Sequence, residues 1–196
     1  MTEAAQAVLA GLEEFGRDND ADQQDRARKM LNLERDTAEF LHLLVRATNR
    51  KRVLEVGTSN GVSAIWIAGA LQDSAGAQPL LTIERDSGKH AQAVENIRLA
   101  GLSARTCLLL GDATEIVRTL VGPFDCVFFD ADRVSAPEQL AILLPKLAPD
   151  CLLLADNALS HPAELAGYRT MVEQLPGFVF ALVPTGKGLH LSHRRV

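Results

Sequence analysis

Acidic residues stand at the ends of several short apolar runs, where they could bind a charged or hydroxyl-bearing ligand. These residues are Glu55, Glu84, Asp112, Asp130 and Asp156. If the runs are parallel strands, their carboxyl ends meet at one edge of a sheet, which is where ligands bind in open α/β folds. Carboxylates at such an edge can accept hydrogen bonds from hydroxyl groups, balance a positive charge or bind a hard cation.

The first of these runs leads into a glycine loop, RVLEVGTSNGVS, at residues 52–63. Gly57 permits a sharp turn after the strand, and Gly61 lets the following helix approach without a Cβ atom in the way. A dinucleotide-binding loop would read G-x-G-x-x-G and would place a pyrophosphate on the helix N-terminus. Because Ser59 and Val62 stand at the second and third glycine positions, that fingerprint fails.

The next acidic residues suggest which ligand the loop holds. Glu84 follows the loop by about 20 residues, where a carboxylate can accept hydrogen bonds from both hydroxyls of a ribose. A ribose without a pyrophosphate indicates an adenosine that carries another group, and Asp112 could receive the adenine amino group. Glu55 adds a negative charge that would suit an ammonium or sulfonium group. Glu84 and Asp112 could instead be helix caps, which is a common role for acids at strand ends.

Together these residues resemble the S-adenosylmethionine-dependent methyltransferases, and in detail the small O-methyltransferases similar to catechol and caffeoyl-CoA O-methyltransferase. The motifs that match, in the family's order from about Asn32 onward, are LEVGTSNGVSA, ERDSGKHAQAVENIRLAGL, GDATEIVRTL, FDCVFFDADR and LLLADNALSH. The resemblance implies that the loop holds S-adenosylmethionine (SAM). It implies cofactor contacts from Glu55, Gly57, Thr58, Ser59, Gly61, Ser63, Glu84, Arg85, Gly111, Asp112, Ala113 and Asp130.

A second cluster follows the fourth and fifth apolar runs. Asp130, Asp156 and Asn157 would supply two carboxylates and an amide oxygen, which together make the all-oxygen type of site that Mg²⁺ or Ca²⁺ accepts. These residues could also be only loop caps and a turn. The resemblance implies that they bind a divalent cation that chelates two vicinal hydroxyls of the methyl acceptor, lowers the hydroxyl pKa and holds the oxygen in line with the methyl group.

One departure from the family pattern bears on catalysis, for which we single out Asp130, Arg133 and His161. Members of the family typically read DADK with a tyrosine shortly after, whereas this chain reads DADRVSA at residues 130–136. Arginine keeps its proton in proteins, so Arg133 cannot replace the lysine as a base, although it could orient an acidic acceptor or stabilise a phenolate. His161 is the nearest alternative base, although a histidine before proline could simply begin a helix.

The elements that must position these residues alternate in type from Lys51 onward. The strands predicted are RVLEV, PLLTIE, RTCLLL, DCVFFD, DCLLLAD, FVFALV and GLHLSH, with helices at Val62–Leu71, Ser87–Ala100, Ala113–Val121, Ala136–Leu147 and Pro162–Leu175. Near-continuous apolar strands between helices predict a mostly parallel sheet with helices on both faces. The resemblance implies that this seven-stranded sheet forms a Rossmann-like methyltransferase fold. The short link at residues 184–188 leaves no room for a helix, so the last strand should run antiparallel.

Residues 1–50 read as an extra N-terminal helical segment of a single domain, whose α/β core spans 51–196. Apolar residues recur at helical spacing through Phe15, and the acidic stretch RDNDADQQD then offers caps for a longer helix that includes Met30, Leu33 and Phe40. We expect these helices to pack on the sheet or on a second subunit. Their amphipathic character makes a homodimer plausible.

The overall composition excludes some classes of binding partner. The chain has 196 residues, a net charge of −5 and no basic cluster, which argues against nucleic acid, and no apolar run approaches the length of a membrane span. The acidic N-terminus is unlike a signal peptide, and Cys107, Cys126 and Cys151 lie far apart in apolar runs, as buried thiols would in a reducing cytosol. We therefore expect a cytoplasmic protein that acts on a small hydroxyl-bearing molecule.

Two alternatives to an active methyltransferase remain from the sequence. A methyltransferase-fold protein that binds the cofactor without transferring a methyl group is favoured by Arg133, whereas the retained Asp130, Asp156 and Asn157 count against it. An NAD-dependent oxidoreductase could share a similar sheet. The failed glycine fingerprint and the hairpin-linked last strands argue against an oxidoreductase.

Overall fold

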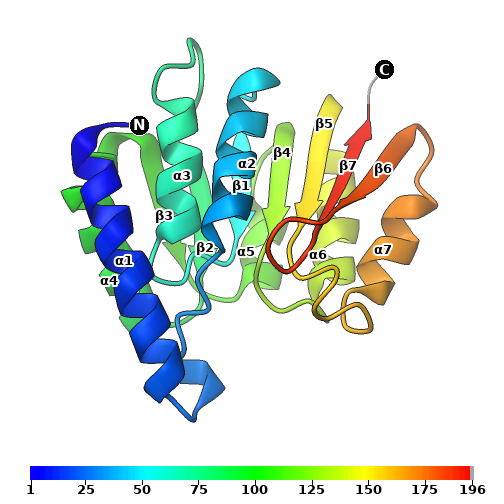
Figure 1. The fold of residues 1–196 in the computed structure, drawn as a ribbon. Coiled ribbons are helices and arrows are strands. Elements are labelled where there is room, and N and C mark those ends of the chain that lie inside the picture. The colour runs from blue at the N-terminus through cyan, green and yellow to red at the C-terminus, as the bar shows by residue number, and fades with distance from the viewer. Residues whose placement is uncertain (195–196) are drawn as a thin grey trace.

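Seven strands form one sheet in the computed structural model, which describes residues 1–194. The strand order across the sheet is β3-β2-β1-β4-β5-β7-β6. Their bounds are β1 Val53–Val56, β2 Leu80–Glu84, β3 Thr106–Leu110, β4 Phe124–Phe129, β5 Leu147–Ala155, β6 Phe178–Val183 and β7 Leu189–Arg194. This order places β1 and β4 at the centre (Figure 1). From β1 to β3 the strands are added toward one side of the sheet, and from β4 onward they are added toward the other side.

Strand direction follows the sequence-based expectation. Strands β1 to β5 pair in parallel, and β7 runs antiparallel to both of its neighbours, β5 and β6. The register aligns Val56 with Ile83 on one side and with Phe129 on the other, and aligns Phe129 with Ala155. Because the next residue of each strand is a predicted site residue, the parallel register brings the predicted site together at one edge.

Helices cover both faces of this sheet (Figure 1). One face packs against α2 (Arg35–Ala47) and α3 (Val62–Leu71), with α1 (Glu3–Asp22) and α4 (Ser87–Leu99) beside them. The other face packs against α5 (Ala113–Thr119), α6 (Ala136–Leu143) and α7 (Ala166–Glu173). Short 3-10 turns occur at 26–28, 103–105 and 144–146. The predicted fold is therefore confirmed, and the N-terminal helices pack within this chain.

The uncharged sequence of helix α3 explains why this helix is buried. The stretch VSAIWIAGAL carries no charged residue, and every residue of it is buried between α2 and the sheet. A helix that is apolar on all sides has to be covered on all sides. Trp66 in this helix is 9% exposed, and its ring meets the His42 ring edge-on at 5.6 Å, so both side chains belong to the packing of this face.

The predicted second helix is wrong at its beginning. Met30 and Leu33 are buried, but they precede α2, which begins at Arg35. The Asp20 carboxylate accepts hydrogen bonds from the backbone of Met30 at 2.6 Å and of Leu31 at 2.8 Å, and Leu31 has a left-handed φ of 51°. These side-chain bonds hold a non-helical segment where the apolar spacing suggested helix.

Other helix ends also differ from the prediction. Helix α5 stops at Thr119 and α6 at Leu143, where Pro145 removes a backbone donor and a 3-10 turn leads into β5; α7 begins only at Ala166. The expectation of three buried thiols is wrong for Cys107, which is exposed on the edge strand β3. Within residues 1–194, none of the helices has both the length and the apolar character that crossing a membrane requires.

Candidate active site at the carboxyl edge of the sheet

Gly57 stands where the loop after β1 passes over the end of β4. Its φ is +103°, and a Cβ atom added there would lie 2.5 Å from the carbonyl oxygen of Asp130. The Asp130 amide in turn donates to the Val56 carbonyl at 2.9 Å. The backbone of the glycine loop therefore rests directly on the backbone of the predicted metal-binding segment, and only glycine fits that contact.

Glu84 fastens the glycine loop to β2. Its Oε2 accepts from the Ser59 amide at 2.8 Å, and its Oε1 accepts from the Asp86 amide at 2.8 Å. Each carboxylate oxygen can accept a second hydrogen bond, so these contacts orient Glu84 and leave lone pairs for a ribose. Ser59, which has a left-handed φ of 49°, also donates its hydroxyl to the Met30 carbonyl at 2.7 Å. The non-helical segment before α2 therefore lies against the loop.

Glu55 lies inside the sheet, with 0% of its surface exposed. Its Oε2 accepts from the Thr82 hydroxyl at 2.5 Å, and because Thr82 has only one hydroxyl hydrogen, Thr58 is the donor of the 2.5 Å bond between the two threonines. Oε1 has no hydrogen-bond partner among the described residues. Burial raises the pKa of Glu55 to about 7, although the hydroxyls of Ser63 and Thr82 lower it and the nearby Glu84 raises it further.

The remaining predicted cofactor residues lie at the same edge, in the loops after the strands and at the starts of the next helices. Gly61 has a φ of +99° and begins α3, and Ser63 is buried in the first turn of that helix. Gly111 follows β3, and the Asp112 carboxylate caps α5 by accepting from the Glu115 amide at 3.1 Å. The capping role weighed for Asp112 is thus observed, and its side chain is exposed. The last two residues of this predicted set are Arg85 and Ala113, which follow Glu84 and Asp112.

Asp130 and Asp156 form an acid pair across β4 and β5. The pKa of Asp130 is raised well above its usual range, chiefly by burial and next by Asp156, with Glu55 adding to the effect. The pKa of Asp156, raised mainly by burial, is about 6, and its Oδ1 is buried without a hydrogen-bond partner among the described residues. Two neighbouring acids with raised pKa values favour a bound cation, because a cation would stabilise their ionised forms.

Arg133 ties together the loops that follow β4 and β5. Its Nη1 donates to Asn157 Oδ1 at 2.8 Å, and its Nε and Nη2 donate to Glu164 Oε2 at 2.9 and 2.6 Å. Asn157 has a left-handed φ of 68° and donates its Nδ2 to Asp156 Oδ2 at 2.6 Å. The guanidinium therefore orients a predicted metal ligand, and three of its N–H groups are engaged within the protein.

His161 does not join the acid pair. Its Nδ1 is 2.9 Å from the hydroxyl of Ser160, and its backbone amide donates to the Asn157 carbonyl. Among the described residues, its ring makes no hydrogen bond to Asp130 or Asp156. The structure therefore places His161 in a bend before α7. Because α7 begins only at Ala166, the alternative that His161 begins a helix is also wrong.

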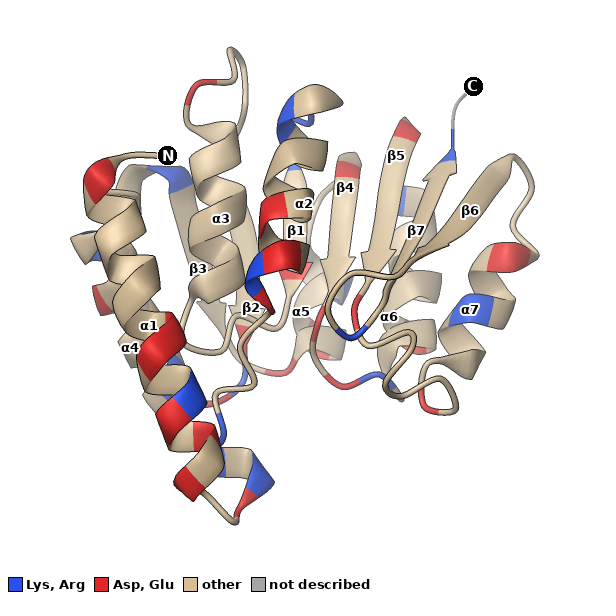
Figure 2. Ribbon diagram, viewed as in Figure 1, with Lys and Arg blue, Asp and Glu red and all other residues tan. Residues whose placement is uncertain are grey.

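Sequence reasoning missed two charged residues at this edge, Glu34 and Lys187. They form an ion pair of 2.6 Å between the start of α2 and the link between β6 and β7. Both residues influence Asp130 and Asp156, because Lys187 lowers and Glu34 raises the pKa of each. Neither belongs to a motif, and only tertiary packing brings them together. In Figure 2 the loops below the carboxyl ends of the strands carry both acidic and basic segments.

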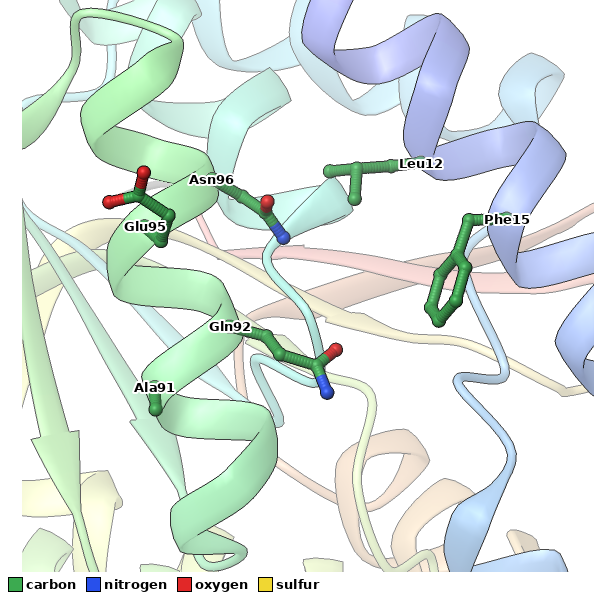
Figure 3. A pocket seen from close by; sticks show the side chains of 6 residues that line it. All are labelled: Leu12, Phe15, Ala91, Gln92, Glu95 and Asn96. Atoms are coloured by element: carbon green, nitrogen blue, oxygen red, sulfur yellow. The ribbon is translucent and has the colours of Figure 1, made fainter.

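A groove of about 500 Å³ lies elsewhere, between α1 and α4 (Figure 3). Figure 3 shows side chains from both helices pointing toward it. Its lining does not include the predicted cofactor or metal residues and consists of Leu12, Phe15, Ala91, Gln92, Glu95 and Asn96. The candidate active site is therefore a separate feature of the molecule.

Comparison with known proteins identifies the family. A family model described as O-methyltransferase matches residues 7–175. This chain belongs to the O-methyltransferase family. The predicted family is thereby confirmed, and the matched residues include the glycine loop, Glu84 and the acid pair.

Relatives of this O-methyltransferase family chain agree with that assignment. A catechol O-methyltransferase from Niastella koreensis is 38% identical over 125 residues, which are 62% of this chain and 55% of that protein. The chain thus spans about half the length of that relative. A Klebsiella pneumoniae protein assigned as an O-methyltransferase is 26% identical with a TM-score of 0.82, covering 100% of this chain and 91% of that one. TomG from Streptomyces achromogenes, solved with SAM, is 25% identical with a TM-score of 0.79 over 100% and 91%.

The burial of Glu55 leads to a prediction about how the stability of the protein depends on pH. The carboxyl of Glu55 ionises near pH 4.5 in the unfolded state and only near pH 7 in the folded state. The free energy of unfolding of the wild type therefore falls as the pH rises through this range. We expect Glu55→Gln to remove that loss and to be more stable at pH 8, by on the order of 3 kcal/mol. Urea unfolding at pH 5 and pH 8 measures the difference.

The same substitution should weaken ligand binding, because it removes the negative charge that a sulfonium or ammonium group would meet. We expect Glu55→Gln to bind SAM at least ~10-fold more weakly by calorimetry. Glu14→Gln on the exposed face of α1 is the matched control and should change neither property. An unfolding free energy whose pH dependence is the same in Glu55→Gln and wild type would contradict the assignment of the raised pKa.

Proposed function

We propose that this chain is a SAM-dependent O-methyltransferase that transfers a methyl group to a hydroxyl oxygen of a small molecule with the help of a divalent cation, Mg²⁺ or Ca²⁺. The observation that carries the proposal is the contact between Gly57 and Asp130, because it joins the glycine loop to the acid pair. Family membership supports the reaction type. The net charge of −5 favours a small-molecule acceptor over nucleic acid or an anionic membrane surface.

The residues at the glycine loop fit SAM. Glu84 has free lone pairs for the ribose hydroxyls, and Asp112 is exposed at the end of β3, where it could meet the adenine. Glu55 presents a buried oxygen without a partner among the described residues, which suits a positively charged group. When bound, SAM supplies a methyl group on a sulfonium sulfur.

The acid pair fits a hard divalent cation. Asp156 Oδ1 is a buried oxygen without a partner among the described residues, and Asp130 lies beside it. The amide oxygen of Asn157 has two lone pairs, so it can accept from Arg133 and still ligate a cation. Among residues 1–194, no group of three or more His, Cys, Asp or Glu side chains is placed to hold a metal, so the site depends on Asn157 as its third protein ligand. A cation held there would lower the acceptor hydroxyl pKa.

The protein's own contribution to catalysis is positioning and electrostatics. Because Gly57 contacts Asp130, a cofactor held at the glycine loop and an acceptor held at the acid pair would be neighbours, and binding would make methyl transfer a local displacement. Arg133 keeps its proton and holds Asn157 in place, so it serves as a positioning residue. Because the guanidinium cannot act as a base, a cofactor-binding protein without transfer activity stays the second candidate. No observation of the structure favours a nicotinamide-dependent enzyme.

Binding and turnover with and without metal test this proposal. We expect micromolar binding of S-adenosylhomocysteine (SAH), the demethylated product, by calorimetry, and methyl transfer from SAM to at least one member of a panel of vicinal diols supplied with Mg²⁺. We expect EDTA to abolish transfer while SAH binding persists, because Glu84 and the acid pair hold different ligands. A protein that binds SAH but never transfers a methyl group would support the second candidate, and failure to bind SAH would refute both.

We also propose that the chain forms a homodimer through β6. This edge strand reads FVFALV without a charged residue, and Val179, Phe180 and Leu182 are 68%, 52% and 41% exposed. An apolar edge strand with unpaired backbone groups is a template for pairing with another strand. Two copies of β6 can pair antiparallel about a twofold axis, and this pairing places no like charges opposite one another. A cytoplasmic location stays a prediction from the sequence.

Substitution on β6 tests the dimer. We expect wild type to behave as a dimer in gel filtration with light scattering, and Val179→Lys to behave as a monomer, because a charge on the edge blocks pairing of the two strands. Val121→Lys, at a loop position that is 75% exposed, is the control and should stay dimeric. A monomeric wild type, or a dimeric Val179→Lys, would contradict the proposal.

A further inference from the structure

The link between β6 and β7 brings a lysine to the acid pair. The carbonyl of Lys187 accepts from the amides of Leu159 at 2.9 Å and Ser160 at 3.0 Å, and the carbonyl of Gly188 accepts from Ala158 at 2.8 Å. These three bonds hold the link directly against the segment that follows Asp156 and Asn157. The backbone of Lys187 is therefore fixed beside the predicted metal ligands.

The side chain of Lys187 spans from this link to the start of α2. Its Nζ lies 2.6 Å from Glu34 Oε1, and the hydroxyls of Thr37 and Thr185 are 3.2 Å apart. Gly186 packs closely here, since a Cβ atom added to it would lie 2.5 Å from Thr37 Oγ1. The other oxygen of Glu34, Oε2, is buried without a partner among the described residues. The ammonium is thus held at a defined position over the sheet edge.

The carboxylates near this position belong to the site. Glu34 before α2 forms the ion pair with Lys187, and Asp156 lies directly before the segment 158–160 that the link contacts. Asp130 is next to Asp156, because Phe129 and Ala155 are aligned and the Asp156 amide donates to the Phe129 carbonyl. Arg133 differs from Lys187 because three of its N–H groups already bind Glu164 and Asn157.

We propose that Lys187 contacts the methyl acceptor and stabilises its ionised oxygen, with Glu34 as the residue that positions the ammonium. An ammonium has three donors, and Glu34 takes one of them, so two remain for an acceptor oxygen. The role is a catalytic one for the reaction put forward above, and it rests on that proposed function. Lys187 would thus supply the compact cation that Arg133 does not supply.

Lys187 stays protonated throughout the methyl transfer. The acceptor hydroxyl loses its proton to solvent, and its oxygen then forms a bond to the methyl carbon as the carbon–sulfur bond breaks. The electron pair of the broken bond stays on sulfur, so the products are a methyl ether and SAH. Lys187 contributes charge and hydrogen bonds to the oxygen before the bond forms, and it exchanges no proton.

Ionisation of a bound chromogenic diol tests this role without requiring turnover. The probe is 4-nitrocatechol, whose absorbance reports ionisation, bound to the full chain with SAH and Mg²⁺. We expect Lys187→Met to raise the pH at which the bound probe ionises by about one unit, because a nearby cation favours the ionised form. Lys187→Arg keeps the positive charge, so its bound probe should ionise close to the pH found for wild type. Lys187→Gln provides a second neutral variant should the methionine variant fold poorly.

Lys51→Met is the matched control, because Lys51 donates to Ser74 and Ala75 at the opposite edge of the sheet and should leave the titration unchanged. SAH calorimetry on each variant shows that the cofactor site is intact. A titration in Lys187→Met and Lys187→Gln identical to that of wild type would overturn the role of Lys187, as would a wild type that binds SAH but not the probe. Failure of wild type to bind SAH would instead overturn the proposed function itself.

Discussion

The structure depends on one close contact between two backbones, at which Gly57 lies against the carbonyl of Asp130. The left-handed φ of Gly57 turns the chain sharply after β1, and the absence of a side chain lets the turn rest on the end of β4. Since β1 and β4 are the central strands, this contact sits where the strand order reverses, which is where open α/β sheets bind ligands. It makes the glycine loop and the acid pair two halves of one site.

This arrangement concentrates carboxyl groups where Lys187 and Arg133 offset their charge only in part. Glu55 is fully buried. Burial also raises the pKa values of Asp130 and Asp156, with Asp156 adding to the first shift and Glu34 to the second. Groups in this state oppose folding when they ionise, so they are expected where a ligand supplies the missing positive charge. A sulfonium beside Glu55 and a cation at the acid pair would each provide it, which explains in physical terms why both halves of the site retain carboxylates.

Local patterns in the sequence were sufficient to predict much of this molecule. The apolar runs predicted every strand and the antiparallel direction of β7, and strand-end acids predicted the site edge. The errors have physical causes: the Asp20 carboxylate binds the Met30 amide and holds that segment out of the helix, and the edge position of β3 exposes Cys107. Glu34 and Lys187 are distant in sequence and meet only through packing between α2 and the β6–β7 link, so no local motif could reveal them.

The affinity for SAH of a Gly57→Ala variant tests the central contact most directly, with Gly76→Ala as its match. Both glycines have a left-handed φ, +103° and +77°, but an added Cβ atom meets Asp130 at Gly57 and nothing within 4 Å at Gly76. With circular dichroism confirming that both variants fold, we predict at least a ~100-fold loss of calorimetric affinity for Gly57→Ala, about 2.8 kcal/mol, and wild-type affinity for Gly76→Ala. Gly57→Ala binding SAH as tightly as wild type would contradict the account.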